Sequence, residues 1–164
     1  MALLEGHGVK AIADVRQIPK SRRYPHFADE NLARELPAQG ILYFPFKQLG
    51  GRRRPRKDSP NTGWRNDSFR GYADYMQTEA FAEALDELMK EASKRPTAIM
   101  CAEAVPWRCH RSLIADALLV RGWAALDIIG PAAPKPHKLT DFAKVSGTCI
   151  TYPPIEPPGL FNSA

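Results

Sequence analysis

The sequence contains Lys10-Ala11-Ile12-Ala13-Asp14-Val15, a run of small and apolar residues that predicts a short buried strand. Two later runs have the same character, Ile41-Leu42-Tyr43-Phe44-Pro45-Phe46 and Thr97-Ala98-Ile99-Met100-Cys101-Ala102, and a fourth strand is predicted over 123–129. Helical patterns separate these strands. Strands that alternate with helices favour a mainly parallel sheet with helices on both faces, so the sequence predicts an α/β fold.

The helical patterns differ in how clearly they begin and end. Thr78 is the predicted N-cap of the clearest helix, whose apolar residues recur at helical spacing: Phe81, Ala84, Leu85, Leu88, Met89 and Ala92. A shorter helix is predicted after Asp29, a candidate N-cap, and Pro37 should end or kink this helix. Another helix should follow Pro106 and end at Gly122.

Length and composition are those of one ordinary globular domain, because the chain has 164 residues, 44% hydrophobic and 25% charged. These values exclude a disordered or fibrous chain. No apolar run approaches the roughly 18 residues of a membrane span, and no leader opens the chain. We therefore expect a soluble cytoplasmic protein with no membrane partner, and three cysteines are too few for a disulfide scaffold. Seven of the fifteen prolines lie beyond residue 130, which predicts an α/β domain over 1–130 and a peripheral or disordered proline-rich extension over 131–164.

Positive charge is concentrated in one third of the chain. Residues 16–70 contain 13 Lys or Arg and 5 Asp or Glu, which favours a phosphate-bearing partner over a plain solvated surface. A long loop predicted at about 48–66 includes Arg52-Arg53-Arg54-Pro55-Arg56-Lys57, and we expect it to be mobile. Aromatic residues follow at Trp64, Phe69, Tyr72 and Tyr75; they suit base stacking, although at least two of the last three fit the core of a helix.

Two segments rich in reactive side chains follow predicted strands. The first contains Asp14 and Arg16 and continues to Ser21 and Arg22; the second runs from 101 to 111. Because ligands of parallel sheets bind at the carboxyl ends of the strands, we expect the two segments to converge on one site. The second segment leads into a helix N-terminus, where backbone N–H groups and the side chains of Arg108, His110 and Arg111 would attract an anion.

The two cysteines of the second segment allow three interpretations. Cys101 or Cys109 could be a nucleophile, with Glu103 or His110 moving protons, and Cys101 is preferred because it ends a strand. Cys101, Cys109 and His110, with Glu103, could instead bind zinc, although a Cys-x-x-Cys pair is lacking. Both cysteines could also be small buried core residues. Six residues separate Cys101 from Arg108, whereas the protein-phosphatase signature has five, which argues against phosphatase chemistry.

Several motifs, in order, resemble the bacterial and archaeal family called domain of unknown function 488. They are Ala13-Asp14-Val15-Arg16, Pro19-Lys20-Ser21-Arg22, Pro25-His26-Phe27, Leu49-Gly50-Gly51-Arg52, the run 69–76, Met100-Cys101-Ala102-Glu103 and Cys109-His110-Arg111. The resemblance covers about 2–129 and implies a Rossmann-like fold with no assigned reaction. Family members usually begin with a strand that ends in a Thr-Ile-Gly-His-Ser-like run, and this chain starts in the following helix. The resemblance therefore implies a sheet truncated at the N-terminus, with an exposed edge or gap.

These observations predict an enzyme-like, anion-binding domain that acts on a phosphorylated, nucleotide or nucleic-acid substrate. The predicted catalytic residues are Cys101, Glu103, Asp14 and His110. The predicted anion-binding residues are Arg16, Ser21, Arg22, Arg52, Arg108 and Arg111. No cofactor is identified, and a homo-oligomer is compatible with the sequence. The alternatives are a non-catalytic nucleic-acid-binding module and a metal-binding protein.

Overall fold

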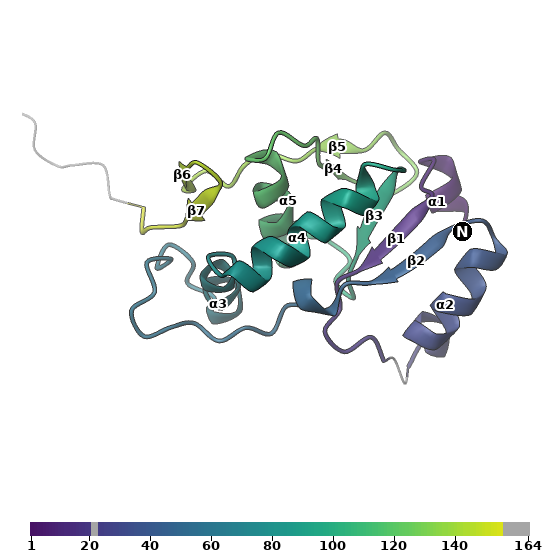
Figure 1. The fold of residues 1–164 in the computed structure, drawn as a ribbon, viewed down its shortest axis with the longest axis horizontal. Helices are drawn as coiled ribbons and strands as arrows, with labels where there is room; N and C mark the ends of the chain where they lie inside the picture. The colour runs from purple at the N-terminus through teal and green to yellow at the C-terminus, as the bar shows by residue number, and fades with distance from the viewer. Residues whose placement is uncertain (21–22, 156–164) are drawn as a thin grey trace, which may run out of the picture.

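The computed structural model describes residues 1–20 and 23–155, and its centre is a parallel three-stranded sheet (Figure 1). Strand β1 (Ala11–Asp14) lies between β2 (Leu42–Pro45) and β3 (Thr97–Met100). Asp14 is in register with both Pro45 and Met100, so the three carboxyl ends meet at one edge of the sheet. The α/β prediction is confirmed.

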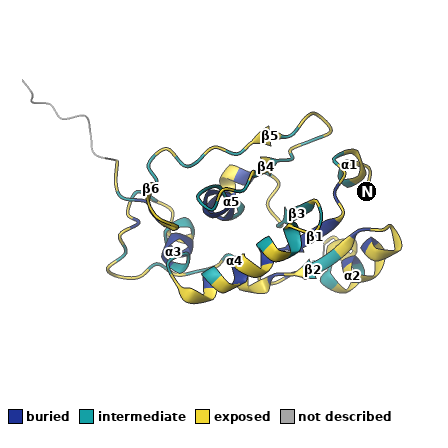
Figure 2. Cartoon of the chain, turned by 45° about the horizontal axis from the view of Figure 1, so that its top comes forward, coloured by how far each residue is buried: buried dark blue, intermediate teal, exposed yellow. Residues whose placement is uncertain are grey.

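The side chains of β1 alternate between two cores, one on each face of the sheet. Ala13 belongs to the larger core, which contains residues of α3 (Asp67–Tyr75), α4 (Glu79–Ala92) and α5 (Arg111–Leu119). Figure 2 shows α5 buried along most of its length, and its residues 112–118 are all buried. The larger core therefore fixes the helix that follows the second predicted site segment.

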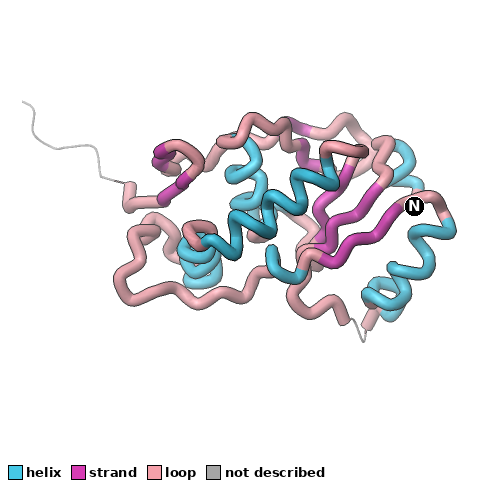
Figure 3. The backbone as a smooth tube through the Cα atoms, viewed as in Figure 1, coloured by secondary structure: helices cyan, strands magenta, loops and turns pink. Residues whose placement is uncertain are grey.

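Ile12 belongs to the smaller core, together with Leu32 and Leu36 of α2 (Asp29–Ala38). The short helix α1 (Ala2–Gly6) lies near the start of β1, and its residue Leu4 packs on this core. Figure 3 shows the helices and long loops around the small sheet.

Local sequence signals account well for α3 and α4. The Asn66 side chain accepts hydrogen bonds from the N–H groups of Ser68 and Phe69, and Thr78 caps α4 as predicted. The inward stripe of α4 is buried at Phe81, Ala84, Leu85 and Leu88. Tyr72 is fully buried, and both Phe69 and Tyr75 pack on the core, which confirms their helical core role.

The predictions for helix ends were partly wrong. Asp29 is the first residue of α2 and Ala28 is the N-cap, while Pro37 lies inside the helix. Pro37 lacks a backbone N–H and so cannot make the helical hydrogen bond that another residue would make at this position. The helix tolerates this loss because only one residue, Ala38, follows Pro37 in α2.

The segment after Pro106 is not a continuous α-helix. It forms a 3₁₀ turn, η3 (Pro106–Arg108), and then Cys109 adopts an extended backbone (φ −137°, ψ 145°) that interrupts the helical path before α5. Two other 3₁₀ turns, η1 (Pro25–Phe27) and η2 (Lys47–Leu49), follow β1 and β2.

The strand predicted at 123–129 is shorter than expected and does not join the parallel sheet. Strand β4 (Leu126–Asp127) pairs antiparallel with β5 (Lys135–Pro136), outside the parallel sheet. Residues 128–134 connect β4 to β5, and a connection this short joins antiparallel rather than parallel strands. Within the described residues, β3 is therefore an edge strand, and its side chains are half-buried.

The C-terminal segment is more closely packed than expected. Strands β6 (Lys144–Ser146) and β7 (Cys149–Thr151) form a hairpin, and Ile150 and Tyr152 are buried in the larger core. The expectation of a peripheral or disordered extension is therefore wrong for these residues; positions 156–164 lie outside the described structure. The domain boundary near residue 130 stays a prediction. No helix among the described residues has the length and apolar character needed to cross a membrane.

Candidate functional site

A cavity of about 360 Å³ lies at the carboxyl ends of β1 and β3. It is bounded by the chain after β1, by the start of the basic loop (residues 50–66), and by the connection from β3 to α5. The predicted site residues that line it are Arg16, Arg52, Cys101, Glu103, Arg108 and His110, and Cys109 joins them. The structure thus brings segments distant in sequence to one site.

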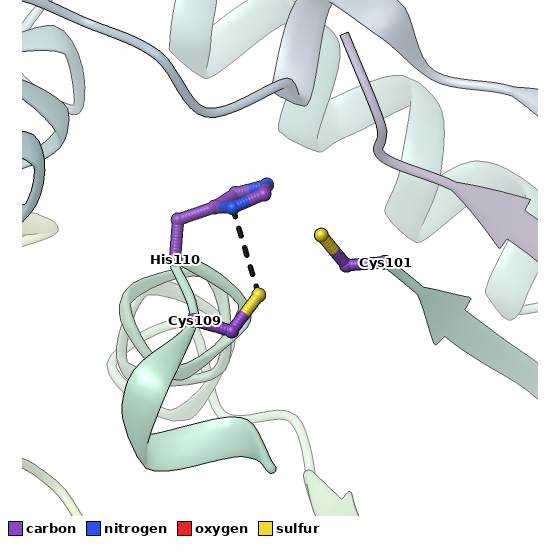
Figure 4. Close-up of side chains that lie close together, drawn as sticks. All are labelled: Cys101, Cys109 and His110. Carbon is purple, nitrogen blue, oxygen red and sulfur yellow. Dashed lines mark hydrogen bonds between the residues drawn. The ribbon is translucent and has the colours of Figure 1, made fainter. Parts of the chain in front are cut away.

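Two cysteines and a histidine face one another inside this cavity (Figure 4). Cys101 follows β3, the extended residue Cys109 ends η3, and His110 is the N-cap of α5. One ligand atom from each residue lies within 4.8 Å of the other two. The Sγ atom of Cys109 is 3.7 Å from His110 Nδ1, and Arg111 Nε donates to the same sulfur at 3.4 Å.

These contacts favour a thiolate at Cys109. The hydrogen bond from the Cys101 thiol lowers the pKa of Cys109, and contacts with His110 and Arg111 lower it further, although burial opposes the charge. The pKa of Cys101 is raised, first by its hydrogen bond to Cys109 and then by burial. Cys101 is the predicted reactive thiol, whereas these contacts give Cys109 the lower pKa of the two cysteines.

His110 is held closely on two sides. Its ring packs on Tyr72 with ring centroids 4.8 Å apart, and a Cβ atom at Gly51 would lie 3.0 Å from His110 Nδ1. Glycine at position 51 therefore lets the basic loop approach the histidine. His110 Nε2 is buried, and no group in residues 1–20 or 23–155 makes a hydrogen bond to it.

Asp14 holds Arg16 in place and does not line the cavity. Arg16 Nε donates to Asp14 Oδ1 at 2.8 Å, and Tyr43 donates its hydroxyl to Asp14 Oδ2 at 2.7 Å. Arg16 also donates to the backbone oxygen of Phe27 at 2.8 Å. Asp14 is only 1% exposed, so its geometry fits a positioning residue better than the predicted catalytic one.

Burial and the hydrogen bond to Asp14 raise the pKa of Tyr43, and the Asp14 contact also raises the pKa of Arg16 although burial opposes it. The Arg16 guanidinium therefore keeps its positive charge at this edge of the sheet.

The remaining predicted residues occupy different places. Glu103, Arg52 and Arg108 are exposed at the cavity, and Arg52 has a left-handed backbone (φ 60°). Arg111 donates to the backbone oxygen of Glu103 as well as to Cys109, so it ties the loop after β3 to the start of α5. Ser21 and Arg22 lie outside the described residues.

Comparison with known families shows which family has this sequence. Residues 1–118 match the family model described as Domain of unknown function DUF488. The chain belongs to this family. No curated protein and no solved structure matches it. All the cavity residues of this DUF488 protein fall within the matched region, and the family description assigns them no reaction.

The basic loop of this DUF488 protein has a polar anchor that the sequence analysis missed. Asp74, a buried residue of α3, accepts hydrogen bonds from the Arg56 N–H at 2.8 Å, Ser59 Oγ at 2.6 Å and Asn61 Nδ2 at 2.7 Å. Burial opposes the charge of Asp74, but these hydrogen bonds together lower its pKa. The sequence does contain a signal for this anchor: Asp74 lies next to Tyr72 and Ala73 in a helix whose other residues there are buried, so its carboxylate needs hydrogen-bond partners.

The basic residues of this loop have separate roles. Arg53 stacks on Tyr75, with its guanidinium carbon 3.6 Å from the ring centroid, and donates to the backbone oxygen of Gln48 at 2.8 Å. Arg52, its neighbour, lines the cavity. Arg53 therefore holds the start of the loop in place, while Arg52 presents its positive charge to the cavity. This arrangement suits the binding of an anion close to Cys109.

Proposed function

We propose that this protein is a thiol-dependent enzyme that acts on an anionic substrate bearing phosphate, a nucleotide or nucleic acid. One observation carries the proposal: the Cys109 sulfur lies in a cavity lined by three arginines, with a second thiol and a histidine directed at it. A buried anionic sulfur is costly unless cations and donors surround it, and such surroundings mark reactive cysteines.

Each residue has a distinct part in the proposed reaction. Arg52 and Arg108 bind the anionic group of the substrate, since they are exposed at the cavity. The Cys109 sulfur attacks an electrophilic carbon or phosphorus, forming one bond to sulfur while the bond to the leaving group breaks. The leaving group takes its proton from solvent water, and Glu103, at the cavity, accepts a proton from the water that releases the product and restores the Cys109 thiolate.

Binding of inorganic phosphate, measured by isothermal titration calorimetry, tests the anion part of this proposal. Arg52→Ala and Arg108→Ala should each weaken binding about tenfold, the typical effect of one charge-assisted hydrogen bond. Arg34→Ala is the matched control, because Arg34 is exposed on α2 and pairs with Glu35. Binding that is unchanged in both cavity variants would contradict the proposal.

The Cys109→Ser variant separates the enzyme from the non-catalytic alternative. Under our proposal this variant keeps phosphate binding and loses every covalent adduct that mass spectrometry detects with the wild-type protein and nucleotide substrates. A nucleic-acid-binding module would show salt-dependent affinity that is the same in wild type and in this variant, with no adduct in either.

A metal centre is the second candidate, and a specific observation favours it. The buried His110 Nε2 lacks a hydrogen-bond partner among the described residues, and two thiols lie close to the same ring. Two cysteines and one histidine form a ligand set typical of zinc with one position left for water or substrate. Elemental analysis of the purified protein decides: about one equivalent of zinc, lost in Cys101→Ser and Cys109→Ser, would support this candidate against a free thiolate.

A further inference from the structure

A second cavity, of about 450 Å³, borders η3 at Trp107, next to Arg108 of the first cavity. Its lining includes Trp64, Trp107, Ile129, Lys135, Lys138 and Thr140. Trp107 is 63% exposed and Ile129 is 51% exposed, so a large aromatic ring and an apolar side chain are both open to a ligand. None of the function proposed above uses this cavity.

The chemistry of the second cavity suits a base and its phosphate. Lys135 and Lys138 are exposed and supply positive charge, while the Trp107 ring offers a flat surface for stacking. The indole N–H of Trp64 is buried, and no acceptor in the described part of the chain bonds to it.

The two cavities border the same two chain segments. Arg108 lines the first cavity and the adjacent Trp107 lines the second. On the facing segment, Phe69 lines the first cavity and Trp64 lines the second, and these two rings stack with centroids 4.7 Å apart. A ligand longer than one nucleotide can therefore occupy both cavities by crossing η3.

We infer that the substrate is single-stranded nucleic acid, with one phosphate at Arg108 and the base of the neighbouring nucleotide stacked on Trp107 in the second cavity. This inference rests on the proposed function, because it assigns the first cavity to a phosphate of the same strand. Stacking reads no particular base, so the site accepts a strand of mixed sequence.

Fluorescence anisotropy with labelled oligothymidylate of eight nucleotides, and competition by thymidine monophosphate, tests the inference. Trp107→Ala should weaken binding of the octamer about tenfold or more, as loss of one base–aromatic stack does, and leave the monophosphate unchanged. Trp107→Phe keeps an aromatic face and should recover most of the affinity. Thermal unfolding of each variant shows whether the fold is intact.

The lysines provide an independent readout that does not depend on the tryptophan. Lys138→Ala should reduce the slope of log affinity against log salt by about one, as expected for one lost phosphate contact. Lys90→Ala is its matched control, because Lys90 is exposed on α4 and does not line either cavity.

Wild-type octamer affinity in Trp107→Ala would overturn the inference, and so would an equal loss for octamer and monophosphate. Phosphate binding that depends on Arg108 would then still support the proposed function. Conversely, Arg52→Ala and Arg108→Ala that both leave phosphate binding unchanged, together with Trp107-dependent octamer binding, would contradict the proposed function and with it the placement of the phosphate.

Discussion

Cys109 and Cys101 occupy opposite environments although their sulfur atoms are close. Cys109 is 3% exposed and has donors around its sulfur, including the side chain of Arg111, whereas Cys101 acts as one of those donors. Removing the Cys101 thiol should therefore change the pKa of Cys109, which accepts its hydrogen bond. We expect Cys101→Ala to raise the pKa of Cys109, with an alkylation rate at pH 6 that falls about tenfold for each unit of increase.

Thiolate absorbance near 240 nm, titrated in a Cys149→Ser background, measures this change. The exposed Cys149 is removed because it is the other free thiol in the chain. A Cys109 titration that is the same with and without the Cys101 thiol would contradict the hydrogen bond between the two cysteines.

The same pair should respond to peroxide. The Cys109 thiolate attacks hydrogen peroxide and becomes a sulfenic acid with release of hydroxide; the Cys101 thiol then displaces water and a disulfide forms. We expect the treated protein to lose two hydrogens by mass spectrometry, reversibly with dithiothreitol. In Cys101→Ser the sulfenic acid should persist and react with dimedone, and a sulfenic acid at Cys101 in Cys109→Ser instead would reverse the assignment.

At the scale of elements, α3 carries both core packing and the anchor of the basic loop. Asp74→Ala leaves the donors of Arg56, Ser59 and Asn61 unpaired, and Asn61 is fully buried. We expect a loss of about 2–4 kcal/mol in unfolding free energy, since each unpaired buried group costs about 1–3 kcal/mol. Trypsin should also cleave the loop at its arginines faster.

Asp86→Ala is the matched control for this change, because Asp86 is exposed on α4 and its replacement should alter neither stability nor cleavage. Equal cleavage of the loop in the Asp74 and Asp86 variants would show that the anchor does not restrain it.

Much of the element order follows from local patterns. The strands near Ile12 and Ile99 and the helix capped by Thr78 are predictable because apolar periodicity and side-chain caps act within a few residues. The pairing of Leu126 with Pro136 is not predictable in this way, because the apolar pattern at 123–129 does not show which strand it will pair with. Pro37 shows the same limit, since its effect depends on how soon the helix ends.

The candidate site also has one feature that the sequence predicts and one that it does not. Convergence of Arg16, Cys101 and His110 follows from the rule that ligands bind at the carboxyl ends of parallel strands. The choice between Cys101 and Cys109 depends on which donors reach each sulfur, which only the three-dimensional arrangement shows.

At the scale of the whole molecule, Asp116 of α5 fastens the C-terminal segment to the domain. This fully buried carboxylate accepts hydrogen bonds from His137 Nε2 at 2.9 Å, Thr140 Oγ1 at 2.7 Å and the Tyr152 hydroxyl at 2.9 Å. Tyr152→Phe removes one of these donors, and we expect it to lower the unfolding free energy by about 1–2 kcal/mol in chemical denaturation. A wild-type unfolding curve for this variant would show that the hydroxyl does not stabilise the fold.

The His137 contact should make stability depend on pH. The hydrogen bond to Asp116 raises the pKa of His137 in the folded protein, and burial opposes this effect. A raised pKa means that the contact stabilises fully below the unfolded value of about 6.5 and is lost as pH rises through the folded value. We expect the melting temperature to fall as pH rises from about 6.5 through the pKa of His137 in the folded protein. In His137→Gln the melting temperature should change less with pH over the same interval. The same pH slope in wild type and variant would assign the effect to other groups.

The proposed chemistry requires Cys109 to be a thiolate in an anion-binding cavity. Alkylation of Cys149→Ser protein by iodoacetamide, after chelation of metals and across pH 5–9, measures this by peptide mass spectrometry. We predict that Cys109 reacts well below pH 8.5, the ordinary pKa of cysteine, that Cys101 reacts far more slowly, and that inorganic phosphate protects Cys109. A Cys109 that stays unmodified at about pH 9 in the folded, metal-free protein, with or without phosphate, would contradict the account.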